Sequence, residues 1–139
     1  MTGEQTLIIV KPDAVERRLI GEILGRFEAA GMAVRQMRML QLDRPQAEGF
    51  YAEHTGKPFF EGLVSYMTSG PCVVALLEGE AAIAGARALM GATNPAHADP
   101  GTIRGDLGLD NTRNSVHGSD SPASAAREIA FLGGGGRAA

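Results

Sequence analysis

Short apolar runs alternate along this chain with segments in which apolar residues recur at helical spacing. Residues 6–10 and 72–77 are continuous apolar runs rich in β-branched side chains, which is typical of buried strands. Residues 33–42 show an interrupted alternation of apolar and polar positions and predict another strand. A short strand is expected at residues 115–117. The pattern therefore predicts four strands.

Helices are predicted between these strands. The apolar residues Ile20, Ile23, Leu24 and Phe27 share one helical face, and Gly31 ends that helix. Residues 59–67 predict a short helix closed by a Ser-Gly-Pro turn, and residues 82–90 carry a single apolar helical stripe.

Capping signals mark two further helices. Asp43 with Gln46 three residues later is typical of a capping pair, and the following helix would carry Ala47, Phe50, Tyr51 and His54 on one face before Gly56 and Pro58 end it. Ser121 followed by Pro122 predicts the start of a final helix that reaches residue 132.

The order of elements predicts an α+β fold of the ferredoxin-like β-α-β-β-α-β kind, with an antiparallel sheet covered by helices. We expect the helices on one face, so that the other face needs cover and favours self-association. Residues 91–113 show no periodicity and predict a long active-site loop. Residues 1–132 are expected to form one domain, and residues 133–139 a flexible Gly-rich tail.

Composition narrows the class of protein. The chain has 139 residues, 44% of them hydrophobic, which suits a single domain with a proper core. No apolar run is long enough to cross a membrane, residues 1–5 lack the pattern of a signal peptide, and Cys72 is the only cysteine. These features predict a cytoplasmic protein without membrane association. The net charge of −3 argues against non-specific nucleic-acid binding.

The candidate chemistry centres on residues 114–120, where His117 lies beside a glycine within a polar cluster. Free imidazole has a pKa near 6.5, so much of it is neutral and nucleophilic at neutral pH. From these residues alone, His117 is either a phosphate-accepting nucleophile or an ordinary hydrogen-bonded loop histidine.

The chain contains neither of the two common glycine-rich phosphate loops. If it binds nucleotides, side chains must hold the phosphates. Candidates at the ends of predicted elements are Lys11, Tyr51, Arg87, Thr93, Arg104 and Asn114.

Six segments in the same order and spacing resemble the nucleoside diphosphate kinase family, over about residues 6–131. They are residues 9–13, 51–54, 56–60, 91–95, 100–104 and 114–120. The resemblance implies a ping-pong phosphotransferase that moves the γ-phosphate of a nucleoside triphosphate, typically ATP, to a nucleoside diphosphate through a phosphohistidine.

The family resemblance also implies a role for each candidate. His117 is the nucleophile, Glu128 orients its ring and Ser119 braces Glu128, while Lys11 and Tyr51 contact the moving phosphoryl group. Arg87, Thr93 and Arg104 hold the other phosphates. Asn114, with Lys11, reaches the sugar, and Phe59 stacks on the base, with Phe60 in the core. The implied cofactor is Mg²⁺, held mainly by the nucleotide phosphates and water rather than by protein ligands.

The resemblance implies a homo-oligomer as well, a tetramer or hexamer built from dimers, with the loop at residues 94–95 used in assembly. Two features depart from the family: Asn111 stands where an apolar residue usually faces the base, and the tail is Gly-rich. His54 and His97 are interpreted as ordinary surface or loop histidines. Arg113 and Asp120 are interpreted as a structural ion pair near the site, within one chain or across a subunit boundary.

Two other functions compete with this one. The first is a catalytically silent nucleotide-binding or interaction module on the same fold. The second is a nucleic-acid-binding protein, which the acidic net charge and the single candidate stacking aromatic disfavour.

Overall fold

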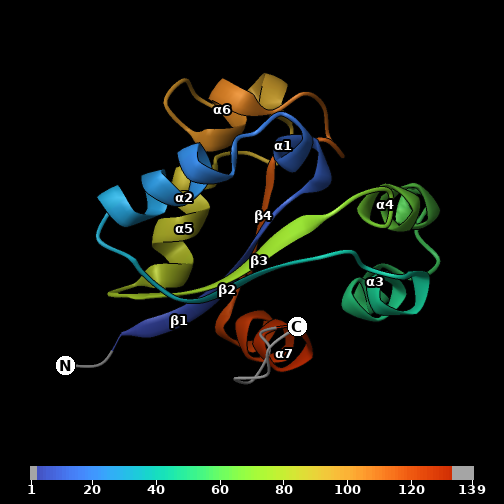
Figure 1. The fold of residues 1–139 in the computed structure, drawn as a ribbon. Helices are drawn as coiled ribbons and strands as arrows, with labels where there is room; N and C mark the ends of the chain where they lie inside the picture. Colours follow the sequence, from blue (N-terminus) through green and yellow to red (C-terminus); the bar gives the residue numbers. More distant parts are fainter. Residues whose placement is uncertain (1–2, 133–139) are drawn as a thin grey trace.

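The computed structural model describes residues 3–132, which form a four-stranded sheet with helices around it (Figure 1). The strands are β1 (Glu4–Val10), β2 (Ala33–Leu40), β3 (Cys72–Gly79) and β4 (Val116–Gly118). They lie in the order β2-β3-β1-β4, and every neighbouring pair is antiparallel. The predicted ferredoxin-like fold is confirmed.

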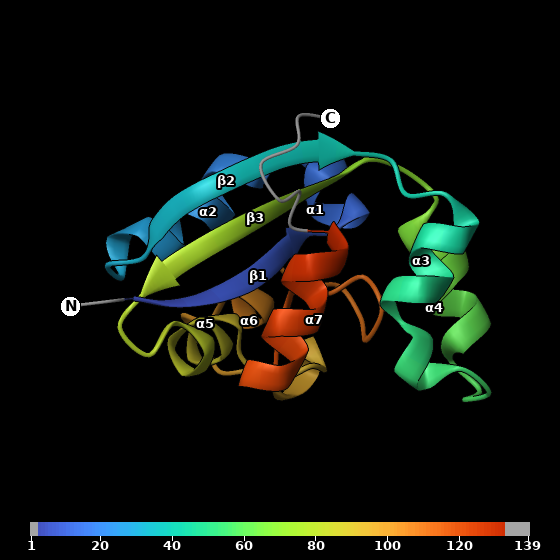
Figure 2. The ribbon, with the colours of Figure 1, turned by 90° about the horizontal axis from the view of Figure 1, so that it is seen from below.

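Helices cover both faces of this sheet, and the expectation of one bare face was wrong. Alternate residues of β1 point to opposite sides, so Ile8 and Val10 enter one core while Leu7 and Ile9 enter the other. The first core lies under α2 (Ile20–Ala29), α5 (Ala82–Met90) and α6 (Ile103–Leu107). The second lies under α3 (Arg44–Phe50), α4 (Phe60–Met67) and α7 (Pro122–Leu132), and Figure 2 shows α7 crossing this face.

The predicted capping signals are present at two helix starts. Asp43 accepts a hydrogen bond from the backbone N–H of Gln46, and the Gln46 side chain accepts one from the backbone of Asp43, which makes a complete capping box for α3. The hydroxyl of Ser121 accepts from the backbone N–H of Ser124 at the start of α7. These bonds fix the two helices that approach His117.

The structure differs from the predicted pattern of elements at three places. The segment after β1 forms a short helix, α1 (Pro12–Glu16), because Pro12 stands at a first-turn position where its missing N–H costs nothing. The helix that begins at Arg44 ends at Phe50, and a separate turn of 3₁₀ helix covers Ala52–His54. The segment 91–113 is not structureless: Asn94 caps a 3₁₀ turn at Pro95–His97 and Thr102 caps α6.

Among residues 3–132, no helix is both long enough and apolar enough to cross a membrane. The predicted Gly-rich tail at residues 133–139 lies outside the described residues.

Candidate active site

His117 lies on β4, the strand at one edge of the sheet. Its backbone is paired with Ile9 of β1, so its side chain shares the sheet face of Ile9 and the second core. The rings of Phe50 and Tyr51, where α3 ends, meet the imidazole edge-on at centroid distances of 5.2 and 6.0 Å. The ring is therefore held against two buried aromatic side chains.

The glycine after His117 allows α5 to approach β4. A Cβ added to Gly118 would lie 2.6 Å from Sδ of Met90, closer than real side-chain atoms come. The carbonyl of Gly118 also accepts a hydrogen bond from Nη1 of Arg87 on α5, at 3.4 Å. Because Gly118 has no side chain, Arg87 of α5 reaches the backbone directly after His117.

Glu128 on α7 fixes one nitrogen of the imidazole. Nε2 of His117 lies 3.0 Å from Oε1 of Glu128, and the hydroxyl of Ser119 donates to the same oxygen at 2.8 Å. Glu128 and Ser119 are buried, whereas the His117 side chain remains 22% exposed. Among residues 3–132, no hydrogen-bond partner occupies Nδ1 of His117, so this nitrogen is available to react.

Lys11, directly after β1, is buried and held by two oxygens. Its Nζ donates to the carbonyl of Thr112 at 2.6 Å and to Oδ1 of Asn114 at 2.8 Å. Burial lowers the pKa of Lys11 to about 8, with a further decrease from Arg104 that Asp13 and Asp110 oppose. The amine remains largely charged at neutral pH.

Arg104 on α6 is also buried and joins two parts of the site. Its guanidinium donates to the carbonyl of Gly91 at 3.0 Å and to that of Val116 at 2.8 Å. Burial, and secondarily the charge of Arg87, lower the pKa of Arg104 to about 10, which leaves it cationic at neutral pH. Asn114 donates to the carbonyl of Thr93 at 2.9 Å, which places Thr93 on the same wall.

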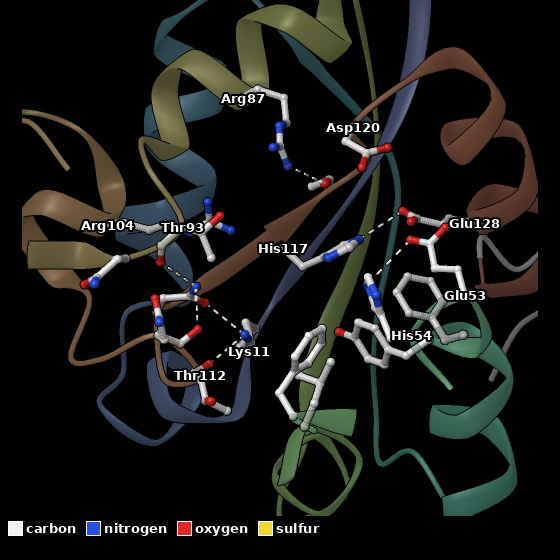
Figure 3. A pocket seen from close by; sticks show the side chains of 18 of the residues that line it. Lys11, Glu53, His54, Arg87, Thr93, Arg104, Thr112, His117, Asp120 and Glu128 are labelled. Atoms are coloured by element: carbon white, nitrogen blue, oxygen red, sulfur yellow. Dashed lines mark hydrogen bonds and ion pairs between the residues drawn. The ribbon is translucent and has the colours of Figure 1, made fainter. Parts of the chain in front are cut away.

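A cavity of about 590 Å³ joins these side chains (Figure 3). Nine of the ten predicted site residues line it: Lys11, Tyr51, Phe59, Arg87, Thr93, Arg104, Asn114, His117 and Glu128. The tenth, Ser119, lies behind Glu128 with its hydroxyl on the carboxylate. Lys11, Arg87 and Arg104 thus line the same cavity as a histidine ring with one unpartnered nitrogen, an arrangement suited to a polyphosphate.

The aromatic residues of the cavity divide into buried and exposed members. Tyr51 is buried, and desolvation followed by the charge of Glu128 raises its pKa above the ordinary value, so its hydroxyl stays a neutral donor. The Phe59 side chain is 51% exposed, with Nζ of Lys57 5.8 Å from its ring centroid, while Phe60 is buried. Phe59 therefore exposes its ring in the same cavity that the basic side chains of Lys11 and Arg104 line.

Sequence reasoning missed part of the lining. His54, interpreted as an ordinary surface histidine, lines the cavity; its ring stacks on Tyr51 at 6.5 Å and tilts against Phe59 at 5.2 Å. Its spacing of three residues from Tyr51 was the available signal. Glu53, Phe50, Leu63, Thr112, Asp120 and Arg127 also line the cavity without having been proposed.

The ion pair expected between Arg113 and Asp120 does not form within the described chain. Arg113 instead pairs with Asp110 at 2.8 Å, because both belong to the same tight turn. A hydrogen bond from Ser124, and to a lesser degree the charge of Arg87, lower the pKa of Asp120. Asp120 is consequently an ionised carboxylate on the cavity wall.

Across residues 3–132, no group of three or more His, Cys, Asp or Glu side chains is arranged to hold a metal ion. Mg²⁺ in nucleotide sites is commonly bound by phosphate oxygens, water and one or two carboxylates. Asp120 supplies one ionised carboxylate beside the cationic wall, so the donor set fits a magnesium ion that arrives with the nucleotide.

Comparison with known proteins agrees with this geometry. Residues 4–133 match the family model described as nucleoside diphosphate kinase. A nucleoside diphosphate kinase of Carboxydothermus hydrogenoformans is 58% identical over 129 residues, covering 93% of this chain and 87% of that protein.

Two solved structures are similar over nearly the whole chain. The nucleoside diphosphate kinase of Aquifex aeolicus has a TM-score of 0.92 and 44% identity, with 94% of each chain covered. That of Encephalitozoon cuniculi, an apo form, has a TM-score of 0.91 and 39% identity, with 93% of this chain and 88% of that chain covered.

Proposed function

The chain belongs to the nucleoside diphosphate kinase family, and from that premise we propose that His117 is its phosphate-accepting nucleophile. The activity is that of the family: the γ-phosphate of a nucleoside triphosphate passes to a nucleoside diphosphate in two steps. The observation that carries the assignment is the hydrogen bond between Nε2 of His117 and Glu128, because it leaves Nδ1 of this cavity-lining ring without a hydrogen-bond partner among residues 3–132.

In the first step, the lone pair of Nδ1 attacks the γ-phosphorus while the bond from that phosphorus to the bridging oxygen breaks. The nucleoside diphosphate leaves with the bonding electrons. The proton on Nε2 stays in its hydrogen bond to Glu128, and the carboxylate offsets the positive charge that grows on the ring. In the second step, a β-phosphate oxygen of another diphosphate attacks the phosphohistidine and frees Nδ1.

The other cavity residues bind and orient the nucleotide. Lys11, Arg87 and Arg104 offset phosphate charge, and the neutral hydroxyls of Tyr51 and Thr93 donate to phosphate oxygens. Asn114, together with Lys11, serves the sugar hydroxyls, and Phe59 offers its open face to the base. Because every base presents a π face, this contact admits different nucleobases.

We propose Mg²⁺ as the cofactor, held chiefly by nucleotide phosphates and water. Asp120, an ionised carboxylate on the cavity wall, would accept hydrogen bonds from water bound to the ion. When bound, the ion neutralises phosphate charge and orients the phosphate chain.

The direct test is phosphoenzyme formation with γ-labelled ATP. Wild type should give a phosphoprotein that is labile in acid and stable in base, and ADP should discharge it. His117→Ala should not label, whereas His97→Ala, which alters a histidine outside the cavity, should label like wild type. Equal labelling of wild type and His117→Ala would exclude this nucleophile.

We further propose that the enzyme is a cytoplasmic homo-oligomer, a tetramer or hexamer built from dimers. Strand β2 supports self-association, because it lies at a sheet edge and exposes Met37 by 55% and Met39 by 52%. Multi-angle light scattering should give the mass of four or six chains. A monomeric mass would reject the oligomer and leave the catalytic assignment untouched.

A further inference from the structure

Arg127, the residue before Glu128 on α7, contacts two of the three side chains that hold the His117 ring, Phe50 and Glu128. Its Nη1 donates to the carbonyl of Phe50 at 3.2 Å, and its guanidinium carbon lies 6.0 Å from the centroid of the Phe50 ring. Its Nη2 lies 3.6 Å from Oε2 of Glu128. One side chain therefore joins the end of α3 to the catalytic carboxylate on α7.

The two oxygens of Glu128 have different partners. Oε1 accepts from Ser119 and faces Nε2 of His117, whereas Oε2 faces Arg127. Within residues 3–132, Arg127 and His117 are the only basic side chains with a nitrogen inside 4 Å of this buried carboxylate. A buried carboxylate requires a compensating charge, so these two side chains share that task.

We propose that Arg127 is a positioning residue for the phosphotransfer: it compensates the Glu128 charge so that His117 need not, and it ties Glu128 to the Phe50 ring that packs on the imidazole. The inference rests on the proposed role of His117. It adds a residue of the cavity wall that acts on the imidazole through Glu128 and Phe50.

The charge argument has a direction. The nucleophile must be neutral imidazole, and an anionic Glu128 without Arg127 would favour the protonated ring. Loss of the arginine charge should therefore move the acid limb of the rate profile to higher pH. Arg127 is 40% exposed, so water screens much of its field, and we expect a displacement of about half a pH unit.

Other charges surround the ring from every neighbouring element, and their contribution is common to all variants in the comparison. They are Asp120 after β4, Lys11 after β1, Arg87 on α5, Arg104 on α6, and Glu53 and His54 in the 3₁₀ turn after α3. None of these is altered in the variants compared, so a displaced limb reports on position 127.

The experiment measures the rate of phosphoenzyme formation from ATP and Mg²⁺ between pH 5 and 9 for wild type, Arg127→Met and Arg127→Lys. Met removes the charge and Lys retains it, so the acid limb should move up in Arg127→Met and return toward wild type in Arg127→Lys. Arg44→Met is the matched control: it removes the same charge from α3 at a similar exposure of 45%, away from the cavity, and should leave the profile unchanged.

An acid limb of Arg127→Met that coincides with wild type would overturn the proposal. So would equal displacement in Arg127→Met and Arg127→Lys, which would show that charge is not the cause. Circular dichroism and melting temperature establish that each variant is folded before its profile is compared. If wild type itself forms no phosphohistidine, the proposed nucleophile fails instead, and that outcome is read from wild type alone.

Discussion

The carboxylate of Glu128 binds His117 through Nε2, at 3.0 Å, and leaves Nδ1 as the ring nitrogen for the phosphotransfer that we propose. Glu128 lies on α7, eleven residues after His117, and a hydrogen bond from Ser119 fixes its carboxylate further. The ring is thereby set in one orientation before any nucleotide binds. Such preorganisation lowers the barrier because little rearrangement is left for the reaction itself.

Replacing Glu128 with Gln should keep the shape of the site and remove the charge that stabilises the developing cation on the ring. We expect the rate of phosphoenzyme formation in a quenched-flow experiment to fall about tenfold to a hundredfold. Ser119→Ala leaves the carboxylate in place and removes one hydrogen bond to the same oxygen, together with the 3.4 Å contacts of that hydroxyl with the backbone of Leu7, so we expect a decrease of about fivefold. A Glu128→Gln enzyme as fast as wild type would contradict the orienting role of the carboxylate.

The lowered pKa of Lys11 predicts that the enzyme takes up a proton when a nucleotide binds near pH 8. Burial lowers the pKa of Lys11 to about 8, so at pH 8 the Lys11 amine is uncharged in about half of the free enzyme molecules. Bound phosphates favour the charged amine and raise its pKa, so ADP binding should draw about half a proton from the buffer. Calorimetry at pH 8 in buffers of different ionisation enthalpy measures this uptake.

Lys11→Arg is the control for that measurement, because arginine is already charged at pH 8 and retains a phosphate contact. The variant should bind ADP without proton uptake. Uptake of equal size in wild type and Lys11→Arg would assign the proton to another group. Absence of uptake in both would show that nucleotide binding does not alter the protonation of Lys11.

Strands β1 and β3 could be predicted from their continuous apolar runs, and β2 from an interrupted alternation of apolar and polar residues. The element that covers the second face could not be predicted. The apolar residues Leu7 and Ile9 indicate that this face of β1 is buried, but they do not indicate which element buries it. Helix α7 supplies the cover locally, and only the topology places it there. Short helices such as α1 and α6 depend on a single proline or capping threonine and carry little periodic signal.

Site residues could be predicted from the sequence where they belong to a recognisable motif. Residues that join the site only through tertiary contacts could not. His117 and Lys11 lie within recognisable segments, and the structure brings them to one cavity. Arg127 and His54 look like ordinary exposed residues in the sequence. The role of Arg127 depends on its contact with Phe50, which is distant in sequence. The role of His54 depends on the packing of its ring against Phe59.

Asn111 predicts a nucleobase preference. It lines the same cavity as Phe59, and its amide can donate and accept hydrogen bonds that differ from base to base. Asn111→Val removes that discrimination, so the KM values for ADP, GDP, CDP and UDP should converge, with individual changes of up to about fivefold. Unchanged ratios among the four KM values, at unchanged kcat, would show that Asn111 does not contact the base.

Two tyrosines predict opposite effects when the hydroxyl is removed. The Tyr66 hydroxyl accepts from the backbone N–H of Asp13 at 2.6 Å and donates to its buried carboxylate, whereas the Tyr51 hydroxyl has no hydrogen-bond partner among residues 3–132. Tyr66→Phe should therefore lower the free energy of unfolding by about 1–3 kcal/mol and leave the rate of phosphoenzyme formation near wild type. Tyr51→Phe should leave stability within about 0.5 kcal/mol of wild type and slow phosphotransfer about fivefold, since only the phosphate contact is lost. Urea denaturation and quenched flow on both variants measure the two quantities, and a Tyr51→Phe enzyme that loses stability but not rate would reverse the assignment of this hydroxyl to the nucleotide.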